Sequence, residues 1–123
     1  MKTYVIQFYY DPNPNDPEPL QAGGILVNPG QYIELEEISP TDGEIKSILV
    51  GIPPGPSYGL KFQLLLNDEQ IFPRTGWFGF ENYASVLDVH WPVKAGDRLR
   101  LRVVNETTQG PYFLNVTVFI EGE

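Results

Sequence analysis

The sequence contains no cysteine and a single histidine, His90. Without cysteine there is no disulfide framework, thiolate metal site or thiol nucleophile. One histidine does not build a typical zinc site, which needs further His or Cys ligands. No serine or threonine lies in a nucleophile elbow such as G-x-S-x-G. We therefore expect no bound metal, no cofactor and no enzymatic activity. Two observations point the other way: His90 would share a strand face with Asp88, and the sequence does not exclude a pair of carboxylates for glycoside hydrolysis.

Long apolar runs and basic residues are also scarce. No stretch reaches membrane-spanning length, and residues 1–10 contain no apolar core of a signal peptide. We expect a chain made in the cytoplasm, without a signal peptide or transmembrane segment. Lys and Arg number 8 against 16 Asp and Glu, a net charge of −8. Because nucleic acids and anionic lipids favour a basic surface, this balance argues against both as partners.

The residues that are abundant indicate an all-β fold. There are 7 Tyr, 7 Phe, 12 Gly and 12 Pro, so short β-forming segments alternate with turn formers. The spacing predicts eight or nine strands, about ten residues apart, in one antiparallel β-sandwich domain that spans residues 1–123 and resembles a jelly roll. The strands are expected at residues 2–10, 25–27, 32–38, 44–52, 59–66, 69–72, 84–91, 97–104 and 112–120.

Residues 11–24 are predicted to form a proline-rich loop or arm. Four prolines fall between Asp11 and Pro19, and proline cannot donate a hydrogen bond to a sheet. The first residues resemble a calcium-binding loop, but Asp16 stands in place of the turn glycine and Ala22 in place of the last glutamate. We expect an extended polar segment that lies across a neighbouring subunit.

The segment Val86–Asn105 reads as two strands joined by a turn, around which the rest of the sheet is organised. Its second strand alternates, with an apolar face towards the core and an arginine face on the other side. The arginine face is expected either to pair across the sheet with two glutamates of the same chain or to meet an acidic partner, such as the acidic first third of a neighbouring copy. The residues concerned are Arg98, Arg100, Arg102, Glu34 and Glu36.

Aromatic residues gather in and near the segment 74–83. Such a group has three interpretations: it covers the open end of a sandwich core, it lies in a protein interface, or it forms a platform on which sugars stack. The sequence leaves all three open. The candidate contact residues are Trp77, Phe78, Phe80, Tyr83 and Trp91.

The C-terminal third resembles the closing strands of compact jelly-roll domains. The segment Pro92-Val-Lys-Ala-Gly-Asp-Arg-Leu-Arg-Leu-Arg-Val-Val-Asn105, followed by Tyr112–Gly122, has an Ala-Gly-Asp turn before an alternating strand that ends in Asn. Together with the acidic, cysteine-free composition and the proline-rich segment, it is similar to capsid decoration or spike proteins of tailed bacteriophages. No functional residue carries over from this resemblance.

These observations lead to one hypothesis and one alternative. The hypothesis is a non-enzymatic structural protein, made in the host cytoplasm and located in the virion, that contacts copies of itself and a capsid protein. The aromatic segment would supply the buried anchors of those contacts. The alternative is a carbohydrate-binding β-sandwich module that uses the aromatic segment at 77–83 and Trp91.

Overall fold

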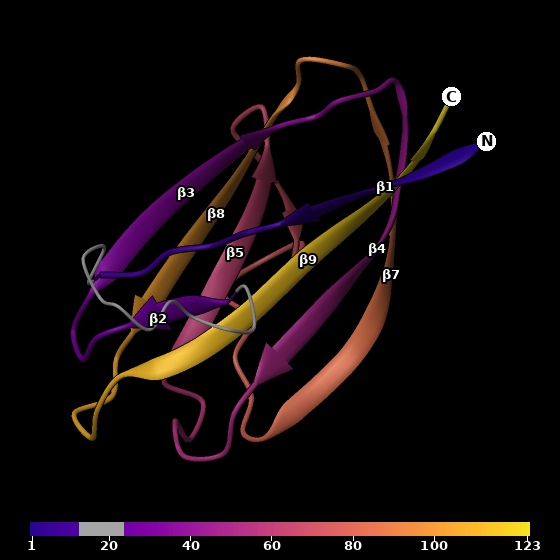
Figure 1. Ribbon diagram of the computed structural model, residues 1–123. Coiled ribbons are helices and arrows are strands. Elements are labelled where there is room, and N and C mark those ends of the chain that lie inside the picture. Colours follow the sequence, from indigo (N-terminus) through magenta and orange to yellow (C-terminus); the bar gives the residue numbers. More distant parts are fainter. Residues whose placement is uncertain (13–23) are drawn as a thin grey trace.

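A computed structural model describes residues 1–12 and 24–123, so most of the predicted proline-rich arm at 11–24 lies outside the described residues. Within them the chain forms nine β-strands and no helix (Figure 1). The all-β prediction is therefore confirmed. The strands are β1 (Lys2–Gln7), β2 (Ile25–Val27), β3 (Tyr32–Ile38), β4 (Gly43–Ile52), β5 (Leu60–Leu66), β6 (Glu69–Phe72), β7 (Tyr83–Val93), β8 (Arg98–Asn105) and β9 (Tyr112–Gly122).

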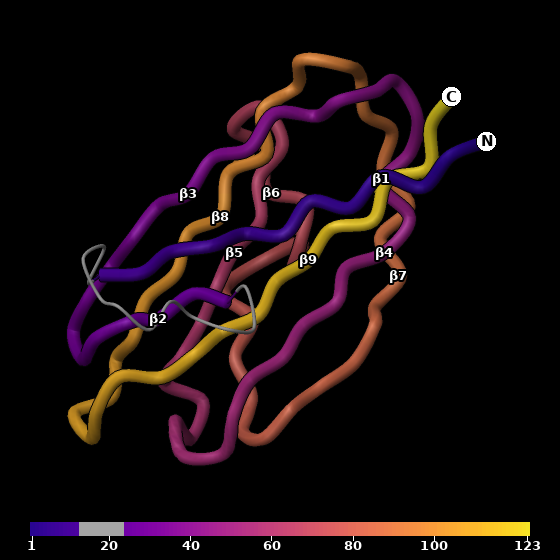
Figure 2. Tube along the Cα trace, viewed as in Figure 1, coloured from indigo at the N-terminus to yellow at the C-terminus, as the bar shows by residue number. Residues whose placement is uncertain are grey.

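The strands form two antiparallel sheets that pack face to face. One has the order β1-β9-β4-β7, with β2 also paired to β9, and the other has the order β3-β8-β5-β6. The pairs β1·β9, β3·β8, β4·β7 and β5·β6 are nested, as in a long hairpin folded over on itself. This nesting is the jelly-roll connection, and it brings the two termini side by side (Figure 2). The predicted jelly-roll-like sandwich is confirmed.

The core lies between the sheets and follows from residue alternation. On β8 the side chains of Leu99, Leu101 and Val103 are fully buried, while the arginines between them point outwards. On β9 the same pattern buries Leu114, Val116, Val118 and Ile120. Burial of this alternating apolar face fixes the register of both strands, since a slip by one residue would expose it.

Strand β4 buries one face although its apolar residues do not alternate. Ile45, Ile48, Val50 and Ile52 all belong to one core, and Leu49 is only half-buried. The register of β4 shifts between Ile45 and Ser47 against both neighbouring strands. This β-bulge inserts one residue into the alternation, so that positions three apart come to the same face.

The first predicted strand is shorter than expected. Strand β1 ends at Gln7, and Phe8 and Tyr10 lie beyond it. The reason is that β2 pairs with residues 112–114 of β9 and occupies the edge along which β1 would have continued. Tyr10 instead makes a parallel bridge to Ile25.

Candidate functional site

The aromatic segment connects the two sheets at one side of the sandwich. It runs from the end of β6, in one sheet, to the start of β7, in the other. Midway, Phe78 forms an antiparallel bridge with Phe62 of β5, in which each backbone N–H donates to the other residue's carbonyl at 3.0 Å. The segment 73–82, called the aromatic loop below, is thereby paired to the edge of the β5–β6 sheet.

Three of the predicted contact residues form one cluster of rings. Phe78 lies 5.0 Å from Phe80 and 5.5 Å from Tyr83 between ring centroids, and Phe80 stacks on Tyr83 at 5.0 Å. Phe78 also touches Phe62, which is fully buried. Phe78 and Tyr83 pack against the core, as the first of the three interpretations expects, while Phe80 is 40% exposed.

Trp77 lies outside that cluster. It makes none of the ring contacts found among the described residues, and its exposed fraction is 40%. Its backbone, however, is held on both sides. The carbonyl of Gly76 accepts hydrogen bonds from the side-chain amides of Gln63 and Gln70, each at 2.9 Å, and Phe78 is bridged to β5. An exposed indole is thus carried by a fixed backbone.

A second clamp holds the far end of the aromatic loop. The carboxylate of Glu81 accepts hydrogen bonds from the backbone N–H groups of Gly55 and Ser57, in the turn between β4 and β5. Tyr58 of that turn reaches over to Phe80, with ring centroids 5.9 Å apart. The loop is therefore fixed at its middle and at its end, which leaves little conformational entropy to lose when a partner binds.

Trp91 lies outside the ring cluster, further along β7 from Tyr83. The guanidinium of Arg74 lies over its ring, 5.0 Å from the centroid. Beside this pair is a hollow of about 400 Å³ between the β6 and β7 edges. Its lining is mostly apolar and aromatic, with Arg74 and Asp88 as the charged groups: Ile71, Phe72, Pro73, Arg74, Phe78, Asp88, Val89 and Trp91.

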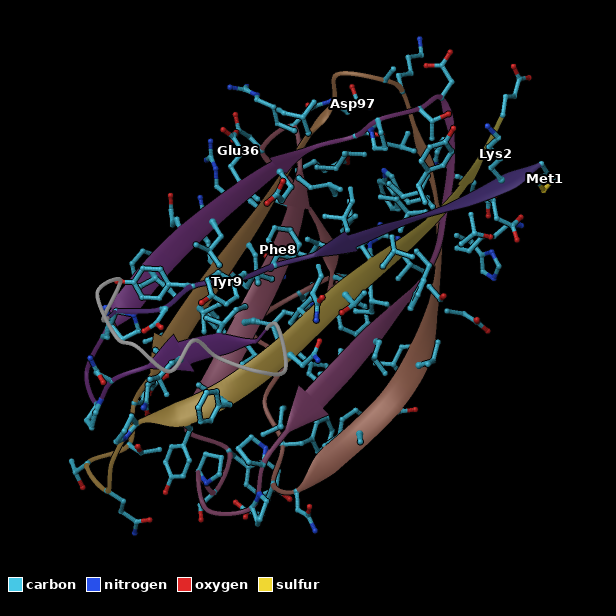
Figure 3. All side chains as sticks on the ribbon, in the orientation of Figure 1. Met1, Lys2, Phe8, Tyr9, Glu36 and Asp97 are labelled. Atoms are coloured by element: carbon cyan, nitrogen blue, oxygen red, sulfur yellow. The ribbon has the colours of Figure 1, made fainter. Side chains whose placement is uncertain are left out.

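The arginine face lies on the outer side of the other sheet, where Figure 3 shows Glu36 pointing away from the core. Glu34 stands opposite Arg102 and Glu36 opposite Arg100 in the register of β3 and β8. Arg98 and Arg100 lie 3.9 Å and 4.0 Å from one carboxylate oxygen of Glu36. The structure thus brings the predicted glutamates beside the predicted arginines.

Asp68, which the sequence analysis did not single out, also joins the arginine face. It sits in the two-residue turn between β5 and β6, where Asn67 and Asp68 both have positive φ values, 48° and 70°. Asn and Asp tolerate this conformation, which a two-residue hairpin turn requires. The turn places the Asp68 carboxylate 2.9 Å from Arg100.

Arg102 contacts its glutamate without a well-directed hydrogen bond. Its Nε lies 3.2 Å from Glu34 Oε1, yet the N–H does not point at an acceptor, so the contact is an ion pair only. Tyr32 donates a better hydrogen bond to the same carboxylate at 2.6 Å. That bond is the main reason that the pKa of Glu34 lies below its ordinary value, and Arg102 and Arg100 lower it further.

The single histidine pairs with a glutamate instead of Asp88. His90 Nδ1 lies 2.9 Å from Glu44 Oε1, and this hydrogen bond is the main reason that the pKa of Glu44 lies below its ordinary value. His90 has a φ of 55° and lies where the register of β7 shifts against β4. Its side chain is 60% exposed, and among the described residues no cluster of acids and histidines is arranged to hold a metal ion.

The structure therefore separates residues that the sequence placed in one group. Phe78, Phe80 and Tyr83 come together, Trp77 stands exposed beside them, and Trp91 lines the hollow with Arg74. Arg74 directly follows the proline that ends β6, and nothing in its sequence neighbourhood marks it. The one signal that could have drawn attention to it is that it is the one arginine outside the alternating strand β8.

Comparisons with known proteins give little further information. No protein-family model and no curated protein matches the chain. Among solved structures, the crystal structure of dimeric latent PorU from Porphyromonas gingivalis is similar, with 14% sequence identity and a TM-score of 0.44. The match covers 97% of this chain but 13% of that one, and we draw no functional conclusion from it. In the described part of the chain no helix is long and apolar enough to cross a membrane.

Proposed function

We propose that this chain is a non-enzymatic structural protein that docks other protein subunits against its aromatic loop, with the virion as the setting implied by its sequence resemblance. The observation that carries the proposal is Trp77. The residue is 40% exposed, while the backbone on either side of it is clamped to the β5–β6 sheet. A large, partly exposed aromatic side chain carried by a fixed backbone is what an interface anchor needs.

The arginine face is a weaker candidate for the main contact. Each of its arginines already lies within 4.0 Å of a carboxylate of the same chain. An acidic partner would have to displace these ion pairs, and exposed pairs contribute only about 0.2–1 kcal/mol each. The face therefore offers a partner little net electrostatic gain compared with an exposed indole.

Sugar binding by the same loop is less well supported. A sugar platform needs open, roughly coplanar aromatic faces. Phe80 and Tyr83 are stacked on each other, and the ring of Trp91 is covered by Arg74. Among the predicted contact residues Trp77 and Phe80 are each 40% exposed, and of these two Trp77 alone makes no ring contact with another described residue.

Sedimentation velocity from low to high micromolar concentration tests the proposal. We expect the wild-type chain to form a species heavier than the monomer and Trp77→Ala to remain monomeric with an unchanged thermal midpoint. Val5→Ala is the control, because Val5 is 59% exposed on β1, at the opposite end of the sheet from β7, and should leave the mass unchanged. An oligomer that persists in Trp77→Ala would contradict the proposal, as would a strict monomer that binds a sugar through Trp77.

A further inference from the structure

Strand β7 forms a free edge of its sheet. It is the last strand in the order β1-β9-β4-β7, and among the described residues it pairs with β4 alone (Figure 1). An antiparallel strand directs its backbone groups alternately to its two sides, so the N–H and C=O groups of every second residue of β7 point away from β4. In the described chain these groups have no partner strand.

The other sheet edges are shorter or more strongly charged. Strand β1 has 6 residues, and β6 has 4 and is followed directly by a proline. Strand β3 carries three glutamates, Glu34, Glu36 and Glu37. Short length, charge and proline are the features by which proteins keep sheet edges from pairing with other chains. Strand β7, with 11 residues, is the longest of the four edge strands.

The second half of β7 is protected in this way, but residues 83–89 are not. His90 has a φ of 55° at the register shift, and Pro92 has no backbone N–H, so residues 90–93 are poorly suited to pairing. Residues 83–89 come before both and contain one charged side chain, Asp88. Their core-facing side chains Leu87 and Val89 are only half-buried, whereas those of the neighbouring inner strand β4 are almost all fully buried. A further strand beside residues 83–89 would complete this cover.

We propose that residues 83–89 of β7 bind an extended, basic segment of another protein, which joins the sheet as an additional antiparallel strand. This docking site is separate from the Trp77 contact proposed above, and either can exist without the other. The free backbone groups determine the kind of partner. They are spaced along a strand edge, and the groups that match this spacing are those of another extended backbone.

Charge favours a basic segment. The chain has a net charge of −8, which attracts a basic partner from a distance. Asp88 is exposed, and in the described part of the chain its carboxylate belongs to no ion pair. A lysine or arginine opposite Asp88 on the added strand would form a favourable cross-strand pair. A second copy of β7 fits less well, because residues 83–89 contain no cation to offset a second Asp88.

The space beside β7 also suits the other side chains of such a strand. Because side chains alternate, the residues next to the basic ones would turn towards Leu87 and Val89. The hollow of about 400 Å³ between the β6 and β7 edges adjoins Val89 and has a mostly apolar lining. The added strand should therefore alternate apolar with basic residues, the apolar ones on the side of the core.

A synthetic peptide as long as segment 83–89, with alternating valine and lysine, tests the proposal by NMR titration. One control peptide has glutamate in place of each lysine. The second has proline as its central residue and keeps the lysines, so it measures attraction by charge alone. We expect the valine–lysine peptide to bind at least about tenfold more tightly than either control. Its binding should slow hydrogen exchange of backbone N–H groups in residues 83–89 and not in β1.

Two matched variants locate the binding site. Val86 and Val5 are exposed to 57% and 59% and lie on opposite edge strands of the same sheet. Val86→Lys places a positive charge beside Asp88 and should weaken peptide binding at least about fivefold, whereas Val5→Lys makes the same change in net charge and should leave it within about twofold. Asp88→Asn should weaken binding about two- to fivefold.

Three results would overturn the proposal. The first is equal binding of the valine–lysine and proline peptides, or no binding at about 1 mM peptide. The second is binding that leaves hydrogen exchange in residues 83–89 unchanged. The third is equal weakening by Val86→Lys and Val5→Lys. None of these results bears on the Trp77 contact, which sedimentation tests separately, and Trp77→Ala should bind the peptide like the wild type.

Discussion

Replacement of Asn105 by alanine should clearly destabilise the fold. Asn105 ends β8 and is fully buried. Its Nδ2 donates to the carbonyls of Val27, at 2.9 Å, and Gly110, at 3.2 Å. Its Oδ1 accepts from the backbone N–H of Thr107 at 3.0 Å and from the Thr107 hydroxyl at 2.7 Å. One side chain thus joins β2, β8 and the turn before β9.

The expected magnitude follows from these bonds. In Asn105→Ala the carbonyl of Val27 loses its partner in the interior, which costs about 1–3 kcal/mol. The other groups are partly exposed and recover some hydration, so each adds about 0.5–1 kcal/mol or less. A total of about 3 kcal/mol corresponds to a fall of about 10 °C in Tm for a chain of this length.

Urea unfolding at neutral pH measures this change. Asn28→Ala is the control, because Asn28 is exposed and should change the free energy of unfolding by less than about 0.5 kcal/mol. A loss below about 1 kcal/mol in Asn105→Ala would show that water replaces the side chain, and the reasoning would be refuted.

Asn105→Asp adds a pH dependence with a defined sign. Burial and the two facing carbonyls would raise the pKa of the new carboxyl in the folded state above its unfolded value of about 3.9. Stability is then greatest at low pH and is lost as pH rises through the raised pKa. An Asp variant whose stability relative to wild type does not improve on acidification would contradict this assignment of donors.

Three further changes test other parts of the fold. In Gly43→Ala the new Cβ would collide with the backbone carbonyl of Glu121. We therefore expect the free energy of unfolding to fall by at least about 2 kcal/mol. A wild-type-like Tm would contradict the β4–β9 register. The pKa of Asp97 lies below its ordinary value of 3.8, chiefly because of a hydrogen bond with the side chain of Asn67 and also because of the backbone N–H of Lys94. The Asp97 carboxylate therefore stabilises the fold above pH 3.8, and this contribution is lost as pH falls through the lowered pKa. In urea unfolding, the difference in stability between the wild type and Asp97→Asn should shrink as pH falls below about 4. Arg100→Gln, which removes the ion pair with Asp68, should cost less than about 1 kcal/mol by the same assay, and a larger loss would mean that the arginine face carries more of the stability than exposed pairs usually do.

The local pattern of the sequence was enough to predict the strands and the fold class. Alternation of Leu99, Leu101 and Val103 with arginines specifies an extended segment with one buried face, whatever its neighbours are. The Asn67-Asp68 turn is equally local, because it depends on which residues accept positive φ. The nine strands observed in the described residues agree with those expected, apart from the end of β1 and shifts of a residue or two elsewhere.

The tertiary structure alone decided which side chains meet, since partners come from strand order and register across distant parts of the chain. The bulge at residue 46 of β4, which turns Ile45 and Ile48 to one face, depends on pairing with β7 and β9. Nothing near Arg74 in sequence indicates that it lies over Trp91. The aromatic residues were recognisable as a group from sequence. Which of them form the ring cluster, that Trp77 is exposed, and that Trp91 lines a hollow all follow from where the two sheets come together.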